Sequence, residues 1–147
     1  MDKKKTVELQ EILMNTSSKR ELEHHFKEME EDFNAPGFLD YYLNHPKVTA
    51  LGEDYKAKII KATNLNREYT YHILNGTKNP GRDKVISLCV AAHFTLEETN
   101  KALTCSNLKC LYARDKRDAI IIFGINKGLS NFDISELIYD FLGEDSK

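Results

Sequence analysis

Apolar residues recur along most of this chain at intervals of three and four, which is the spacing of amphipathic helices. The clearest interruption is the Asn-Ala-Pro-Gly segment at residues 34–37, because proline and glycine both punctuate regular structure. A second break follows at Pro46, which is expected to end a short helix and open a loop. Helices are expected over residues 5–15, 18–33 and 38–44, and again from residue 55 onward. The pattern therefore predicts an all-α protein.

The segment before the first break, residues 1–36, is expected to form an N-terminal helical hairpin. Ser18 followed by Glu21 has the form of a capping box and should open the second helix of that hairpin. This helix carries an apolar stripe spaced by four, three and four residues, a spacing typical of a coiled-coil seam. The stripe consists of Leu22, Phe26, Met29 and Phe33.

The last third of the chain repeats the pattern of the segment before it at an offset of 35 residues. Aligned pairs include Arg82 with Arg117, Asp83 with Asp118, Val85 with Ile120, and Thr95 with Ser130. Each copy has an apolar helix, a short turn and an amphipathic helix. Residues 119–125 alone are compatible with a buried strand, but their counterpart at 84–91 has a helical pattern, so a buried helix is expected. The repeat predicts a C-terminal helical hairpin over residues 105–147, packed on the preceding domain.

Residues 55–82 give the strongest indication of function, as a short helix, a tight turn, a second helix and an Asn-Gly-Thr-Lys-Asn-Pro exit. Residues four apart share one face of the second helix, so its apolar spacing sets which side is buried. The buried face is expected to hold Tyr69, Thr70, Ile73 and Leu74. The outward face is expected to hold Arg67, Glu68, Tyr71, His72 and Asn75. Donors, acceptors and flat rings on a short helix suit the edges of base pairs in the major groove.

These features resemble the lambda repressor and Cro-like family of bacterial helix-turn-helix regulators, also called the xenobiotic-response-element type. The resemblance is carried by the turn at Asn64 and Leu65 and by the Asn-Gly-x-x-x-Pro exit at residues 75–80. Asn64 stands where the family usually has glycine, and asparagine is the next-best residue for a left-handed turn. A longer pattern, which resembles a subset of such proteins in Gram-positive bacteria, includes residues 82–86, 95–99 and 111–122.

The resemblance implies a helix-turn-helix DNA-binding domain over residues 37–104, with the helix at about 66–75 in the major groove of double-stranded DNA. Positions near the start of that helix are expected to contact bases: Arg67, Glu68, Tyr71 and His72. Contacts to the DNA backbone are expected from Lys56, Asn75, Lys78, Asn79 and Arg82. Since such proteins usually pair on DNA, a homodimer is expected, through the C-terminal hairpin or through the stripe at residues 19–33.

The net charge of −2 is divided unevenly along the chain. Residues 35–82 carry seven Lys and Arg against four Asp and Glu, or +3, whereas residues 1–34 carry −3 and residues 83–147 carry −2. Positive charge therefore concentrates on the segment that is expected to meet phosphates. There is no apolar run as long as a membrane span and no signal peptide, and the three cysteines are irregularly spaced, so a cytoplasmic protein is expected.

The sequence offers no candidate for catalysis, for a metal or for a cofactor. It has no Gly-rich phosphate loop, no nucleophile elbow and no pair of acidic residues spaced for acid–base catalysis. Cys105 and Cys110 lack the spacing and the histidine companions of a zinc site, and the rings of adjacent His24 and His25 should diverge on a helix by about 100°. The mixed-charge segment at residues 114–118 is interpreted as a solvated helix start, with an anion or partner site as the alternative.

Two functions from different classes stay open. The first is sequence-specific binding of double-stranded DNA by a transcriptional regulator. The second is a helical protein–protein interaction module that keeps the helix-turn-helix architecture without binding DNA, because a fold does not fix a function. The overall acidity supports the second, whereas the cations and the outward polar face within residues 55–82 support the first, which we favour.

Overall fold

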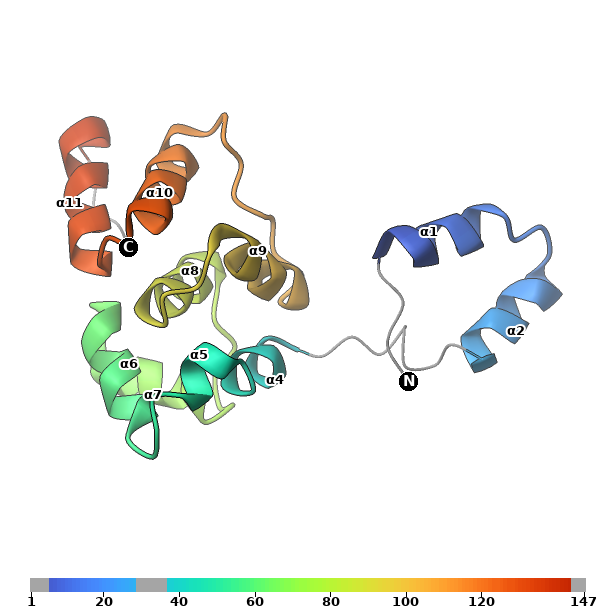
Figure 1. The fold of residues 1–147 in the computed structure, drawn as a ribbon, viewed down its shortest axis with the longest axis horizontal. Coiled ribbons are helices and arrows are strands. Elements are labelled where there is room, and N and C mark those ends of the chain that lie inside the picture. Colours follow the sequence, from blue (N-terminus) through green and yellow to red (C-terminus); the bar gives the residue numbers. More distant parts are fainter. Residues whose placement is uncertain (1–5, 29–36, 144–147) are drawn as a thin grey trace. The chain divides into compact units, whose positions relative to one another are not determined.

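The computed structural model describes residues 6–28 and 37–143, and all regular secondary structure in these ranges is helical (Figure 1). The prediction of an all-α protein is confirmed for this part of the chain. The helices are α1 (Thr6–Met14), α2 (Lys19–Glu28), α4 (Phe38–Leu43), α5 (Pro46–Thr49), α6 (Tyr55–Thr63), α7 (Arg67–Leu74), α8 (Arg82–Ala91), α9 (Leu96–Cys105), α10 (Lys116–Lys127) and α11 (Asn131–Leu142). The chain divides into two compact units, Met1–Pro36 and Gly37–Lys147, and each is described by itself.

In the first unit, two serines and a glutamate fix the start of α2. The Glu21 backbone N–H donates to Ser18 Oγ at 3.1 Å, and the Glu21 carboxylate accepts from the Ser17 backbone N–H at 3.2 Å. The reciprocal bonds expected of one capping residue are thus shared between two. No described side chain of α2 is buried, and Phe26 is 47% exposed. Two members of the expected apolar stripe lie outside the described residues, namely Met29 and Phe33.

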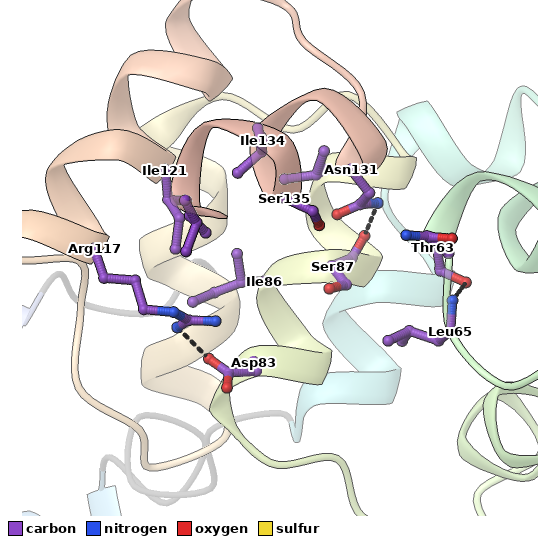
Figure 2. A pocket seen from close by; sticks show the side chains of 13 residues that line it. Thr63, Leu65, Asp83, Ile86, Ser87, Arg117, Ile121, Asn131, Ile134 and Ser135 are labelled. Carbon is purple, nitrogen blue, oxygen red and sulfur yellow. Dashed lines mark hydrogen bonds and ion pairs between the residues drawn. The ribbon is translucent and has the colours of Figure 1, made fainter. Parts of the chain in front are cut away.

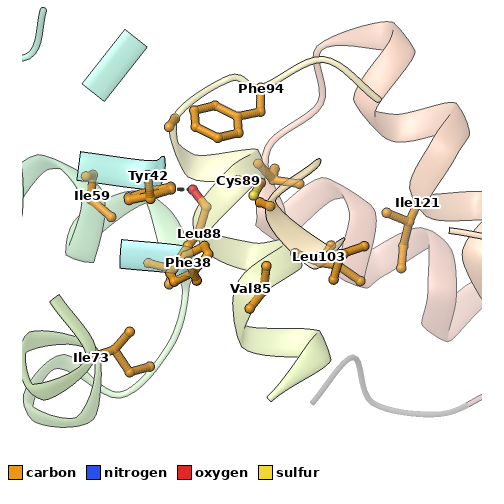
Figure 3. Packing of buried hydrophobic residues seen from close by; sticks show 14 of the residues in the cluster. Phe38, Tyr42, Ile59, Ile73, Val85, Leu88, Cys89, Phe94, Leu103 and Ile121 are labelled. Atoms are coloured by element: carbon orange, nitrogen blue, oxygen red, sulfur yellow. Dashed lines mark hydrogen bonds between the residues drawn. The ribbon is translucent and has the colours of Figure 1, made fainter. Parts of the chain in front are cut away.

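In the second unit, α8 and α9 form the middle layer (Figure 1). α4 packs against α9 and α6 against α8, while α10 and α11 cover the other side of the same pair. Apolar side chains from all three layers meet in one core (Figure 3), whose fully buried members include Tyr42, Ile59, Ile73, Leu88, Leu103 and Ile138. The Tyr42 hydroxyl donates to the Leu88 carbonyl oxygen at 2.6 Å, which satisfies the polar atom that this ring brings into the core.

Helix α5 occupies the segment after Pro46, where a loop was expected. Pro46 is its first residue, a position whose N–H has no partner within the helix, and His45 Nδ1 caps the helix by accepting from the Lys47 backbone N–H at 3.1 Å. Glu98 of α9 lies 2.7 Å from His45 Nε2 and also pairs with Lys47. Burial raises the pKa of Glu98, but hydrogen bonds from Lys47, the Thr95 backbone and His45 outweigh it and lower the pKa to about 2. This cluster ties the α4–α5 segment to α9.

The two copies of the repeat exchange ion pairs. Arg82 at the start of α8 pairs with Asp118 of α10, and Arg117 of α10 pairs with Asp83 of α8, each at 2.8 Å. The Asp118 side chain is 7% exposed and that of Asp83 is 39% exposed, so the carboxylate is buried only in the first bridge. Burial raises the pKa of Asp118, but hydrogen bonds from Arg82 and from the Tyr112 backbone N–H lower it by more, so the net shift is downward.

Helix α10 forms where the repeat predicts it, yet only one side of it is buried. Its inner face holds Ile121 and Gly124, whereas Phe123 is 51% exposed. Gly124 allows α11 to approach closely, because a Cβ at this position would clash with Cγ1 of Ile134. The expectation of a buried helix at residues 119–125 is right about secondary structure, but the helix is not buried all round, because Phe123 is half in solvent.

Candidate nucleic-acid interface

The turn between α6 and α7 takes its shape from two asparagines. Asn64 has a φ of 59°, in the left-handed region that asparagine tolerates better than most non-glycine residues. Asn66 then caps α7, because its side-chain oxygen accepts from the Tyr69 backbone N–H at 2.9 Å. Together they set the direction in which α7 leaves α6.

The inner face of α7 is the one that the apolar spacing predicts. Thr70, Ile73 and Leu74 are buried and Tyr69 is half-buried. The Thr70 hydroxyl donates to the Asn66 carbonyl oxygen at 2.8 Å, so this buried polar group has a partner within the helix. With this face fixed against the core, the opposite face of α7 is turned outward.

The four residues predicted to contact bases lie together on that outward side: Arg67, Glu68, Tyr71 and His72. Tyr71 is 47% exposed, and His72 Nε2 lies 4.0 Å from a Glu68 carboxylate oxygen one turn earlier. Arg67 and Tyr71 also form one wall of a surface groove between α7 and α6. The α6 wall of that groove consists of Lys56, Ala57, Ile60 and Lys61, with Asp54 at the start of the helix.

Lys56 and Asn75, both predicted to contact the DNA backbone, bind each other. Lys56 Nζ donates to Asn75 Oδ1 at 2.7 Å and lies 5.3 Å from the centre of the Tyr71 ring. The pair joins α6 to the C-terminal end of α7, and the cation–π contact holds the ammonium group beside the outward face. Local sequence patterns do not show this contact, because it joins residues that stand 19 apart.

The exit from α7 presents two further predicted residues, Lys78 and Asn79, to solvent. The backbone N–H groups of Thr77 and Lys78 both donate to the His72 carbonyl oxygen, at 2.9 and 3.2 Å, and so close the end of the helix. Gly76 has a φ of 83°, which explains the glycine of the Asn-Gly motif. Among the described residues, no ion pair or side-chain hydrogen bond occupies the Lys78 ammonium group.

Arg82 has a different environment from the other predicted contacts. Its guanidinium donates to Asp118 at 3.0 and 2.8 Å and to the carbonyl oxygens of Lys109 and Cys110 at 2.9 and 3.0 Å. The donors that would reach a phosphate are therefore engaged within the protein. We leave Arg82 out of the candidate interface on this ground.

Lys61 also belongs in the candidate interface, although it is not among the residues that the sequence predicts to contact DNA. It is exposed, lies in the α6–α7 groove and forms no ion pair with a described residue. The buried residues Ile59 and Thr63 set the phase of α6, and that phase places Lys61 outward. The apolar spacing of α6 therefore indicates from sequence that Lys61 faces outward, as the apolar spacing of α7 indicates its outward face.

A small hollow of about 60 Å³ lies behind the α6–α7 turn, where α8, α10 and α11 meet it. Figure 2 shows the Arg117–Asp83 bridge on one side of this hollow and Asn131 on the other. The Asn131 amide donates to the carbonyl oxygens of Ala62 at 2.8 Å and Ser87 at 2.9 Å. The polar lining groups of Asp83, Arg117 and Asn131 are already paired within the protein, so we assign the hollow a packing role.

Comparison with protein-family models, with curated proteins and with solved structures gives no match for this chain. Within residues 6–28 and 37–143, no group of three or more His, Cys, Asp or Glu side chains is arranged to hold a metal ion. No helix in these ranges is both long enough and apolar enough to cross a membrane.

Proposed function

We propose that this protein binds double-stranded DNA in a sequence-specific manner, as a bacterial transcriptional regulator of the lambda-repressor type, with α6 and α7 as its helix-turn-helix. The observation that carries the proposal is the outward polar face of α7, flanked by cations that lack ion-pair partners among the described residues. Lys61, Arg67 and Lys78 are such cations. If the polar face of α7 were only a solvated surface, it would not require unpaired cations from neighbouring elements on the same side of the molecule.

Base contacts are assigned to the outward face of α7. Arg67 lies in the first turn, where its planar guanidinium can take the O6 and N7 acceptors of a guanine together. Glu68 can accept from the N4 amino group of a cytosine, while Tyr71 and His72 offer flat rings with polar edges. Loss of Arg67 should relax the sequence preference at one base pair.

Backbone contacts are assigned to Lys56, Lys61, Asn75, Lys78 and Asn79. They lie at the two ends of the outward face, on α6 and on the exit from α7. Because phosphate contacts release condensed counterions, they should make binding steeply dependent on salt.

The proposal includes a homodimer, for which the outward side of α11 is the favoured interface. Phe132 is 58% exposed, and Tyr139, which lies two turns later on the same face, is 61% exposed. The repeat places Glu97 of α9 opposite Phe132 in the alignment and Thr104 opposite Tyr139, so aromatic rings stand where the first copy has polar residues. A second copy of the chain would remove these rings from water, and a two-fold interface accepts the same surface from both partners.

The DNA-binding test is a salt titration by fluorescence anisotropy on a duplex selected from a random library. Arg67→Ala should cost about 1–3 kcal/mol on the selected duplex and little on an unrelated one. Lys78→Ala should weaken both duplexes alike and lower the slope of log affinity against log salt by about 1. Lys101→Ala on α9, which removes an exposed cation outside the proposed interface, is the control. If neither salt nor these substitutions changed the affinity for the duplexes, the protein–protein interaction module would be the favoured function.

The dimer is tested by light scattering on the Phe132→Ser/Tyr139→Ser double variant against Glu97→Ser/Thr104→Ser, its counterpart in the first copy. The aromatic double variant should be monomeric at micromolar concentration, and the control should keep the mass of the wild type. A wild type that is itself monomeric removes the dimer from the proposal. A dimer that survives the aromatic substitutions moves the interface to residues 19–33.

A further inference from the structure

We propose that the segment between α9 and α10, residues 106–115, together with Lys116 forms a second contact to the DNA backbone, adjoining the one at the exit from α7. The inference rests on the proposed DNA-binding function and extends it to a part of the chain outside the helix-turn-helix. We call this stretch, residues 106–116, the α9–α10 segment.

The α9–α10 segment is held in a fixed conformation at four consecutive residues. The carbonyl oxygens of Lys109 and Cys110 accept from the Arg82 guanidinium, at 2.9 and 3.0 Å. The next two backbone N–H groups donate to side chains, that of Leu111 to Asn100 and that of Tyr112 to Asp118, both at 2.9 Å. A connection without regular structure is thereby preorganised, which lowers the entropy cost of binding.

The same contacts place the segment beside the start of α8, where the exit loop from α7 ends. Arg82 is the first residue of α8 and follows the exit loop that carries Lys78 and Asn79. Because one arginine side chain joins this point to Lys109 and Cys110, the segment lies within a side chain's reach of the end of the exit loop. The bonds that engage the Arg82 guanidinium thus also hold the cations of the α9–α10 segment near the end of the exit loop.

The charge of the segment is directed outward and is not neutralised. Lys109, Arg114 and Lys116 are exposed, and none forms an ion pair or side-chain hydrogen bond with a described residue. Asp115 caps α10 by accepting from the Asp118 backbone N–H at 2.9 Å. The cations that lie inward, Arg82 and Arg117, are both paired with aspartates. A surface that pairs its inner arginines and leaves its outer cations free is suited to a polyanion.

An exposed aromatic residue lies within this cationic stretch. Tyr112 is 58% exposed, although its backbone N–H is fixed by Asp118, and the preceding Leu111 is buried. A phenolic hydroxyl is one of the groups that commonly bind DNA phosphate oxygens. The segment therefore offers both charged and neutral donors to a sugar–phosphate strand, and it offers no helix or strand that would read a groove.

The test compares two double variants that remove the same charge, Lys109→Gln/Lys116→Gln in the segment and Lys101→Gln/Lys127→Gln on α9 and α10. All four lysines are exposed, and only Lys127 has a described contact for its ammonium group, 5.9 Å from the centre of the Phe123 ring, so nearly equal melting temperatures are expected. On the selected duplex in about 0.1 M salt, the segment variant should bind roughly tenfold more weakly or worse. Its slope of log affinity against log salt should fall by up to about 2. Its preference for the selected over an unrelated duplex should be unchanged.

Three outcomes are distinguishable. If the segment variant binds like the α9/α10 control while Lys78→Ala is weakened, the α9–α10 segment is not a DNA contact and the proposed function stands. If the wild type shows no salt-dependent binding to any duplex, both proposals fail together. If the segment variant loses binding to poly-glutamate but keeps its affinity for DNA, the segment recognises an acidic protein, which overturns the inference as stated.

Discussion

The two hairpins of the second unit, α8–α9 and α10–α11, have aligned sequences but lie in different layers of the fold, the first in the middle and the second outside. Leu88 of the first copy is fully buried, and its counterpart Phe123 in the second is 51% exposed. The first copy lies between two layers of helices, whereas the second packs on the first and has one outward side. One periodicity can therefore specify the same helices without specifying their burial, because burial depends on what lies on the far side.

The largest difference between the copies is expected from truncating that apolar pair. Leu88→Ala should destabilise the protein by about 2–5 kcal/mol, because it removes buried methyl groups and leaves a cavity in the middle layer. Phe123→Ala should cost under about 1 kcal/mol, because the ring is half in water already. Urea unfolding followed by circular dichroism measures both. Equal losses would mean that another chain or element covers α10.

The exchanged ion pairs provide the next comparison. Asp118→Asn should cost about 2–4 kcal/mol, because it leaves the partly buried Arg82 without a counter-charge and weakens an acceptor of the Tyr112 N–H. Asp83→Asn, in the more exposed bridge, should cost less than about 1 kcal/mol. The same unfolding experiment ranks the two, and a reversed order would contradict the burial of the first bridge.

The dependence of stability on acid pH should involve Glu98 more than Asp133, the residue that the repeat aligns with it. Hydrogen bonds hold the pKa of Glu98 at about 2, below its ordinary value of 4.5, so folding favours the ionised form. The stabilisation is complete above about pH 4.5 and is lost as the pH falls toward 2, on the order of 2 kcal/mol. Glu98→Gln should flatten the acid limb of stability against pH, while Asp133→Asn serves as the control. A Glu98→Gln variant with an unchanged acid limb would show that the Lys47 and His45 contacts contribute nothing.

The smallest effect is expected at Gly124 of α10, which the repeat aligns with Cys89 of α8. Gly124→Ala gains helix propensity but forces its methyl group into Ile134, so a net loss of about 1–2 kcal/mol is expected. Ile134→Val or Ile134→Ala should make room for the methyl group, so the double variant should lose less stability than the sum of the two single losses in a double-mutant cycle. Additive effects would mean that α10 and α11 can move apart at no cost.

The sequence anticipated local features far better than distant ones. The helices, the left-handed Asn64 and the inner face of α7 all follow from spacing and residue type over a few positions. The short helix ends before Pro46 as expected, but Pro46 then begins α5 where a loop was expected, because a proline suits the first position of a helix as well as the region beyond its end. Local pattern alone does not distinguish these two roles.

The predicted site was limited in the same way. Arg82 sits at the right distance from α7 in sequence to meet a phosphate, and no nearby residue suggests otherwise. Its partners Lys109, Cys110 and Asp118 stand 27, 28 and 36 positions away. The 35-residue repeat aligns Arg82 with Arg117 and Asp83 with Asp118, yet it does not reveal that the copies exchange these charges. The pairing depends on how the hairpins pack, which a linear alignment leaves open.

The bond from the Asn131 amide to the Ala62 carbonyl oxygen has a consequence for how the protein forms during synthesis. It satisfies a carbonyl in the last turn of α6 with a residue made 69 positions later. A nascent chain that has only just exposed α7 outside the ribosome therefore lacks this partner, and water can hydrate the Ala62 carbonyl oxygen until α11 emerges. The last turn of α6 thus gains this contact only after α11 has also been translated.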